Sequence, residues 1–311
     1  LGDENRFFKW IGWIVLAASG IVLITAGEYT QSVLENVLIM MLFGLSLQWM
    51  MALSGWVSFG HAAYFGLGAY AAALSHLHWH FNAIMAALAG VVAAFLAALC
   101  MGKLLQRSTG VYLAMLSLAF AQMVWATASQ WVSFTGGDNG LIGLQFFDGM
   151  SRWIFQVVLI LLCFVTLFGF SRLIRSSFGA ALQAGRDAPQ RAQASALNVA
   201  NLNQRVFLMS AGLAGLSGAL WAMSKGAVFP SVASVSNSVD ALMVVLLGGV
   251  HQLWGAFAGS LFLVGVGSEI GRYFEYWRGS LGLLIMLLMV FAPEGILGLR
   301  KFDKHSASRA L

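Results

Sequence analysis

A histidine and several hydroxyl side chains lie inside one of the most apolar stretches of the chain. The stretch GWVSFGHAAYFGLGAYAAA covers residues 55–73, and its first half holds Ser58, Gly60, His61 and Tyr64. Imidazole and phenol groups form hydrogen bonds, and burying them in an apolar span without partners is costly. Two interpretations stay open. The small residues serve tight helix packing alone, or the four named residues line a path for a solute.

Four ionisable residues fall near the ends of apolar runs: Glu35, Asp240, His251 and Glu269. A charge at the centre of a bilayer costs roughly 2.5 to 3.5 kcal/mol on insertion scales, so we expect these residues at depths that water reaches. A proton relay would need several carboxylates at mid-depth, and the pattern does not supply them. The four residues are therefore predicted to lie at a mouth or an interface.

The motifs of nucleotide hydrolysis and metal catalysis are absent from the sequence. The only Gly-Lys pair, Gly102-Lys103, is followed by Leu, so there is no phosphate-binding loop. No His-Glu-x-x-His motif or nucleophile–base pair occurs, and Cys100 and Cys163 sit in apolar runs without a partner pattern. We expect no enzymatic activity and no cofactor or metal in this chain.

The composition is that of a membrane protein. Hydrophobic residues make up 59% of the 311 residues and charged residues 9%, against about 25% charged in soluble domains. We predict an all-α, polytopic membrane helix bundle forming a single domain over residues 1–311. The third and eighth spans are short, and are tilted, broken or partly re-entrant. The ten predicted spans are 8–26, 33–52, 61–76, 83–102, 111–131, 153–171, 205–224, 239–250, 255–271 and 279–298.

The basic residues indicate the orientation. With the N-terminus placed in the cytoplasm, all 17 Lys and Arg residues fall on the cytoplasmic side except Arg152, Lys225, Arg272 and Arg278. This asymmetry supports an even number of spans with both termini in the cytoplasm; eight spans would give the same parity as ten. The basic balance is thus a topology signal with some affinity for anionic lipid, and we expect no nucleic acid as a partner.

Glycine spacing predicts close helix contacts. In AGLAGLSGALWA, residues 211–222, Gly212, Gly215 and Gly218 recur every third residue. GAFAG at 255–259 repeats the pattern. Small residues at such spacing favour helix packing over ligand contacts.

One long polar segment, residues 175–204, interrupts the apolar runs on the predicted cytoplasmic side. Asp187 is expected to cap a short helix from about Ala188 to about Ala196, with Pro189 in its first turn. Asn201 is expected to cap the next span. An ordinary connecting loop is the alternative.

A second polar segment, FTGGDNGLIGL, lies on the predicted outer side at residues 134–144. Gly136, Gly137, Asp138 and Asn139 form a turn sequence. The turn is compatible with a simple hairpin between spans and with an external mouth that docks a soluble partner.

Several of these stretches resemble the permease subunits of branched-chain amino acid ABC importers, of the LivM type. The resemblance spans most of the chain in the family's order, although the family commonly has glycine at the position of Ala196. It rests on SGWVSFGHAAYFGLGAYAAAL (54–74), TGGDNGL (135–141), SSFGAALQAGRDAPQRAQASALNVANLNQRVFLMSAGLAGLSGAL (176–220), DALMVVLLGGVHQLWGAFAGS (240–260) and FAPEGILGL (291–299).

The resemblance implies a bacterial inner-membrane importer subunit that carries leucine, isoleucine or valine; relatives carry urea, short amides or aromatic acids. It implies a second related permease of the LivH type, a periplasmic binding protein at the outer loops, and two ATPase subunits that bind ATP and Mg. The cytoplasmic segment would couple to those ATPases. Its candidate coupling residues are Arg186, Asp187, Ala188, Pro189, Gln190, Arg191 and Ala192.

Two other classes compete with this interpretation. A secondary transporter would work alone on an ion gradient, but the polar cytoplasmic helix and the lack of mid-membrane carboxylates disfavour it. An intramembrane enzyme would need a facing catalytic pair, which the sequence does not contain.

Overall fold

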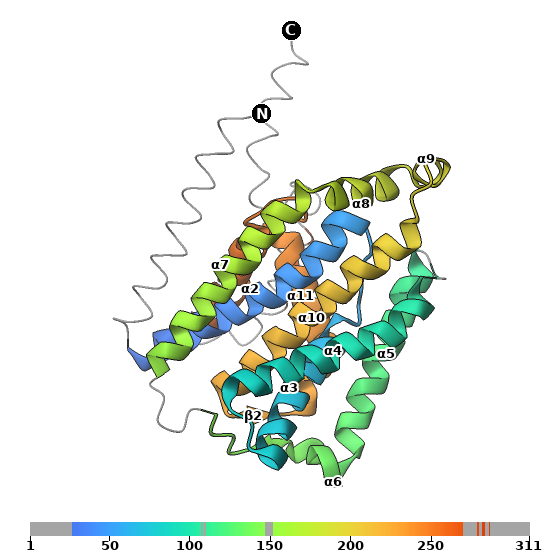
Figure 1. The fold of residues 1–311 in the computed structure, drawn as a ribbon. Helices are drawn as coiled ribbons and strands as arrows, with labels where there is room; N and C mark the ends of the chain where they lie inside the picture. Colours follow the sequence, from blue (N-terminus) through green and yellow to red (C-terminus); the bar gives the residue numbers. More distant parts are fainter. Residues whose placement is uncertain are drawn as a thin grey trace.

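The chain folds as a helical bundle, which confirms the all-α prediction (Figure 1). The computed structural model describes residues 27–269 apart from 107, 109 and 147–151, together with the isolated positions 279, 282, 283 and 286. The described α-helices are α2 (Glu28–Ser54), α3 (His61–Trp79), α4 (Ala83–Leu105), α5 (Val111–Gln130), α6 (Val132–Thr135), α7 (Arg152–Ile174), α8 (Ser177–Asp187), α9 (Pro189–Ala194), α10 (Val199–Lys225), α11 (Val235–Gly248) and α12 (Gly255–Ser260). The 3-10 helices η1 (Gly137–Asn139) and η2 (Pro230–Ala233), the π-helical turn η3 (Leu261–Val266) and the strands β1 (Leu141–Ile142) and β2 (Ala227–Val228) complete the described elements.

Five described helices are long and apolar enough to cross a membrane: α2, α4, α5, α7 and α10. They match five predicted spans. The segments Val235–Gly248 and Gly255–Glu269 are apolar but shorter. The predicted spans 8–26 and 279–298 lie outside the described residues, apart from the isolated positions, so the total of ten stays a prediction.

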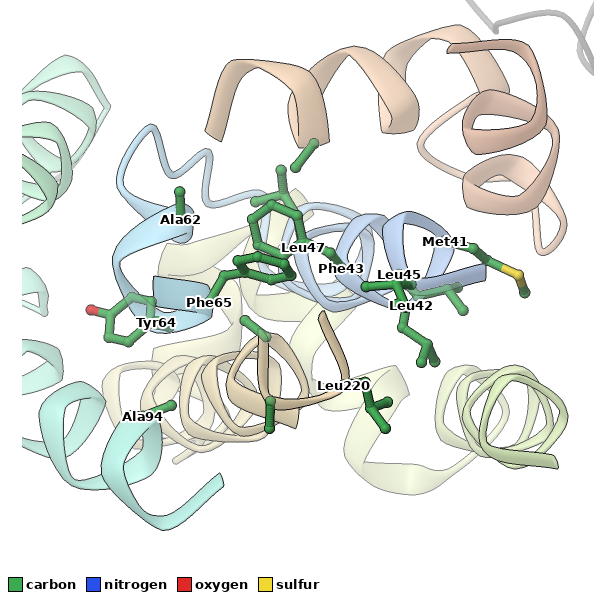
Figure 2. Close-up of a cluster of buried hydrophobic side chains, with 14 of the residues drawn as sticks. Met41, Leu42, Phe43, Leu45, Leu47, Ala62, Tyr64, Phe65, Ala94 and Leu220 are labelled. Carbon is green, nitrogen blue, oxygen red and sulfur yellow. The ribbon is translucent and has the colours of Figure 1, made fainter. Parts of the chain in front are cut away.

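Helix α2 lies at the centre of the bundle. It contacts α10, α7, α11, α12 and α8, and its C-terminal two-thirds is almost wholly buried. Figure 2 shows Phe43 and Leu47 of α2 beside Phe65 of α3, in the middle of the apolar cluster. The helix ends where Gly55 takes a left-handed conformation, φ 72°, and its N–H binds the carbonyl of Met51.

Glycine lets the backbones of α3, α4 and α10 approach closely. A Cβ at Gly218 would overlap the carbonyl oxygen of Phe65, and one at Gly68 would overlap the backbone of Gly215. Gly90 of α4 in turn faces the backbone of Gly68. The packing seam predicted for residues 211–222 is therefore confirmed, and it fixes these three helices against one another.

Helices α3 and α11 begin inside the bundle rather than at its ends. After α2, residues 55–60 turn back between the helices, and α3 starts at His61 beside Ser46 of α2. Ser238, in the first turn of α11, is buried and accepts a hydrogen bond of 2.9 Å from the backbone N–H of Ala62. The third and eighth predicted spans are short because their helices start at this depth.

Two groups of connecting segments lie at opposite ends of the bundle (Figure 1). Helices α8 and α9 lie across one end, which we call the α8–α9 end. At the other, the β1–β2 end, Leu141 pairs with Val228 and Ile142 with Ala227 in an antiparallel ladder. That ladder ties the α6–η1 loop to the segment that follows α10.

Candidate translocation path and coupling surface

His61 lies in a buried polar cluster with two serines. Its Nε2 is 2.9 Å from Ser46 Oγ and 3.3 Å from Ser210 Oγ. Each hydroxyl has one proton, and each already donates it to a carbonyl, Ser46 to Phe43 at 2.6 Å and Ser210 to Ser46 at 2.5 Å. We therefore assign the hydrogen to Nε2, which donates it to Ser46 and leaves Nδ1 as an acceptor. Nδ1 is buried and has no hydrogen-bond partner among the described residues.

The other three candidate path residues surround this histidine. Ser58 Oγ accepts the N–H of Gly60 at 3.3 Å, and the N–H of Phe59 donates to Ser117 Oγ of α5 at 3.1 Å. A Cβ at Gly60 would overlap the carbonyl oxygen of Ser117, so only glycine fits there without displacing α5. Tyr64, one turn further along α3, is buried against aromatic rings. The structure thus brings the four residues together in a packed arrangement.

The predicted outer loop forms a rigid turn at the β1–β2 end. Gly136, Gly137 and Gly140 all have left-handed φ angles, and Thr135 Oγ1 donates its hydrogen to the carbonyl oxygens of Ala128 in α5 and of Trp131 just after α5, each at 2.7 Å. Residues 138 and 139 are exposed at the tip. The loop is therefore a tight, hydrogen-bonded turn whose tip exposes the carboxylate of Asp138 and the amide of Asn139.

Before α10 begins at Val199, the polar segment 175–204 contains two helices, one more than predicted. Ser176 caps α8, since its Oγ accepts the N–H of Gly179 at 3.1 Å. Leu182 of α8 packs with Leu53 of α2 and Val206 of α10 in a separate small apolar cluster. Tertiary packing of this apolar face holds α8 against the bundle.

Arg186 anchors the end of α8 to α2. Its guanidinium donates hydrogen bonds to the backbone carbonyl of Ala52 and, from Nε, to Asp187 at 2.7 Å, and its side chain lies against Gly55. The hydrogen bond from Arg186 lowers the pKa of the Asp187 carboxyl. We expected Arg186 to face a partner, but about three-quarters of its side chain is covered.

The remaining coupling candidates lie on or beside α9. Pro189, Gln190 and Arg191 are exposed, whereas Ala192 is buried and Ala188 is half-buried. The accessible surface of this segment is thus carried by the outer side of α9.

Two predicted helix caps were wrong. Asp187 is the last residue of α8, and no side chain caps α9, because the carboxylate binds Arg186 instead. The cap of α10 is Asn198, whose side chain accepts the N–H of Asn201 at 3.1 Å, so α10 begins several residues earlier than predicted.

Glu35 was predicted at a water-accessible position, but it is 1% exposed. Arg152 contacts both carboxylate oxygens at 3.0 and 3.2 Å, and Gln156 and Ser224 add hydrogen bonds of 2.9 and 2.8 Å. The cluster joins α2, α7 and α10 near the β1–β2 end. Sequence reasoning missed it, although the Arg152–Gln156 spacing places two polar residues on one face of α7.

A family model described as "Branched-chain amino acid transport system / permease component" matches residues 29–293. The chain belongs to this family. It is a membrane permease subunit of the ABC transporter class and not an enzyme, because ATP hydrolysis in such transporters belongs to separate subunits.

Individual relatives agree with this membership. The high-affinity branched-chain amino acid transport system permease protein LivM of Escherichia coli is 29% identical over 92% of this chain and 74% of its own length. The LivM protein of Salmonella typhimurium is 30% identical over 84% of this chain and 68% of its own. A probable LivH permease of Methanocaldococcus jannaschii is 27% identical over 68% of this chain and 65% of its own. No solved structure matches the chain.

Proposed function

We propose that this chain forms part of the translocation path of an ATP-driven importer for leucine, isoleucine and valine in the bacterial inner membrane. A periplasmic binding protein delivers the substrate to the β1–β2 end, and a second, LivH-type permease completes the path. Two ATPase subunits bind ATP and Mg and dock on α8–α9, so this chain itself holds no cofactor.

The observation that carries the proposal is the connection from α9 to α3. Helix α8 is fixed to the last turn of α2 through Arg186, and Ser46 of α2 contacts His61 at the start of α3. A force applied to α8–α9 therefore reaches the buried polar cluster through one packed helix. Protein interiors are close-packed and transmit displacements of this kind.

The distribution of basic residues supports placing the α8–α9 end in the cytoplasm. Within the described residues, Arg152 and Lys225 are the Lys and Arg side chains on helix ends at the β1–β2 end. Cytoplasmic loops carry the excess of Lys and Arg in membrane proteins. The basic residues toward the other end are Lys103, Arg172, Arg175, Arg186, Arg191 and Arg205.

The test is substrate uptake by proteoliposomes that contain both permeases and both ATPases, with ATP inside and loaded binding protein outside. We expect leucine uptake that stops when this chain is omitted or when ATP is replaced by a non-hydrolysable analogue. Uptake driven by an ion gradient without ATPases would contradict the proposal. Transport of urea, a short amide or an aromatic acid in preference to leucine would retain the importer and reject the substrate.

A further inference from the structure

One backbone N–H group in the first turn of α3 and one just before the helix donate to serine hydroxyls of neighbouring helices. The N–H of Phe59 donates to Ser117 of α5, and the N–H of Ala62 donates to Ser238 of α11. These acceptors belong to helices that are separate from α3. If α5 or α11 moved away from α3, these N–H groups would lose their acceptors at a depth where an unpaired polar group is costly.

A helix N-terminus that loses its acceptors is suited to an anion. The first N–H groups of a helix point outward, and the helix dipole adds partial positive charge. Here α3 and α11 meet first turn to first turn, since Ser238 is in the first turn of α11 and Ala62 in that of α3. A carboxylate placed between them would replace the serine oxygens with a charged acceptor.

His61 supplies an independent indication of a ligand. It is the first residue of α3, it is fully buried, and its Nδ1 has no hydrogen-bond partner within the described part of the chain. With the hydrogen assigned to Nε2, Nδ1 is an acceptor that needs a donor. An ammonium group is such a donor, and it would stand beside the carboxylate site.

Apolar rings surround the same point. Phe43 stacks on the imidazole of His61 at 5.8 Å, and Phe65 packs on Phe43 at 4.6 Å between ring centroids. Figure 2 shows Phe43, Phe65 and Tyr64 around the start of α3. These rings suit an aliphatic side chain next to a polar head group.

We propose that the first turn of α3 and the residues just before it bind the main chain of a zwitterionic α-amino acid when both α5 and α11 separate from α3. The N–H groups of Phe59 and Ala62 bind the carboxylate, and Nδ1 of His61 accepts a hydrogen bond from the ammonium. In the structure described here the serines occupy these N–H groups, so the site is closed. This inference rests on the proposed function, because it specifies the ligand chemistry of the path.

The first arm of the test uses the wild-type complex of both permeases and both ATPases in nanodiscs without the binding protein, which would otherwise impose its own selectivity. Binding of radiolabelled leucine is measured in competition with leucinol, which lacks the carboxylate, and 4-methylpentanoate, which lacks the ammonium. We expect each analogue to compete at least tenfold more weakly than leucine, as for loss of a hydrogen bond to a charged group. Equal competition by either analogue would overturn the proposal.

The second arm uses matched variants of His61. His61→Gln keeps a donor near the Nε2 position, whereas His61→Asn keeps an acceptor near the Nδ1 position. We expect His61→Asn to retain leucine affinity within about threefold and His61→Gln to lose about tenfold. The reverse order would show that the histidine serves only to hold Ser46.

A third variant is expected to gain affinity, a result that misfolding would not produce. Ser238→Ala removes the side chain that competes for the Ala62 N–H, so leucine affinity should rise several-fold. Unchanged or lower affinity would overturn the proposal. If the wild-type complex drives ATP-dependent uptake but shows no leucine binding, the inference fails alone; if it drives no uptake at all, the proposed function fails.

Discussion

The guanidinium of Arg186, in the last turn of α8, hydrogen-bonds the carbonyl oxygen of Ala52 in the last turn of α2. The last four carbonyls of a helix lack intrahelical partners, and a cation there also complements the helix dipole. Arg186 therefore joins the surface helices to the central helix of the bundle. This contact is where we expect motion of an attached ATPase to enter the membrane domain.

We predict that Arg186→Ala uncouples ATP hydrolysis from transport. The variant loses the link to Ala52, at a cost of about 1 kcal/mol in stability for a partly exposed hydrogen bond from a charged group. ATPase subunits should still co-purify, because the exposed side of α9 is unchanged, while the number of ATP molecules hydrolysed per leucine imported rises. An unchanged ratio of ATP to leucine would show that the link is not used.

The matched variant is Arg191→Glu on the exposed side of α9. It reverses a charge at the proposed docking surface without touching the link to α2. We expect weaker co-purification of the ATPases, with the effect growing at low salt, since exposed charges are screened. Normal co-purification at every salt concentration would place the docking surface elsewhere.

Gly60→Ala should displace α5 from α3. The added Cβ overlaps the backbone carbonyl of Ser117, and overpacking of this kind costs about 1 to 3 kcal/mol. The control is Gly212→Ala in α10, where the new Cβ would meet only Val91 at 3.8 Å and should stabilise by about 0.5 to 1 kcal/mol. Thermal unfolding in the same detergent should give a lower melting temperature for Gly60→Ala than for Gly212→Ala. Equal melting temperatures would contradict this prediction.

Removing one member of the Glu35 cluster should weaken the junction of α2, α7 and α10. Arg152→Gln leaves a buried carboxylate with Gln156 and Ser224 as its remaining partners. Because Arg152 is half exposed, we expect a loss of about 1 to 3 kcal/mol, below the 3 to 5 kcal/mol typical of a fully buried pair. The double variant with Glu35→Gln should lose less free energy of unfolding than the two single variants lose together. Strict additivity of the losses in this double-mutant cycle would exclude the pairing of Arg152 with Glu35.

Ala196→Gly should stabilise the turn between α9 and α10. Ala196 has φ 60°, a left-handed conformation that costs a residue with a Cβ about 1 kcal/mol or more and costs glycine little. The resemblance to the family indicated glycine at this position, and the backbone angle supplies the physical reason. Slower proteolysis of segment 188–198 in Ala196→Gly, and faster proteolysis in the control Ala194→Gly within α9, are the expected results.

Sequence reasoning predicted the features that depend on local pattern. Long apolar runs identified α2, α4, α5, α7 and α10, and the third and eighth spans were predicted to be short and tilted, broken or partly re-entrant. The prediction of the Asp187 cap was wrong because its carboxylate can accept a hydrogen bond either from a backbone N–H of α9 or from the Arg186 side chain. In the folded chain it accepts from Arg186. Helix α8 was missed for a similar reason: its two glycines disfavour a helix locally, and contacts of Leu182 with other helices stabilise it.

The sequence also did not predict which individual polar residues are buried. Glu35 lies one turn from Gln31 near the start of a span, which is compatible with exposure to water or with a polar contact between helices. In the fold, Arg152 lies opposite Glu35 and binds it, although it follows more than 100 residues later in the sequence. The polar contact between helices is therefore the correct alternative. His61 and its serines converge in the same way from three different helices.

The central claim is that α9 meets the ATPases in the cytoplasm while the η1 loop faces the opposite side. A single-cysteine experiment tests it in the assembled importer, after Cys100→Ser and Cys163→Ala remove the native thiols. Gln190→Cys should cross-link to an ATPase subunit and react with a membrane-impermeant maleimide only from the cytoplasmic side, whereas Asn139→Cys should react only from the periplasmic side. Labelling of Gln190→Cys from the periplasm, or no cross-link to the ATPase in a transport-competent complex, would contradict the account.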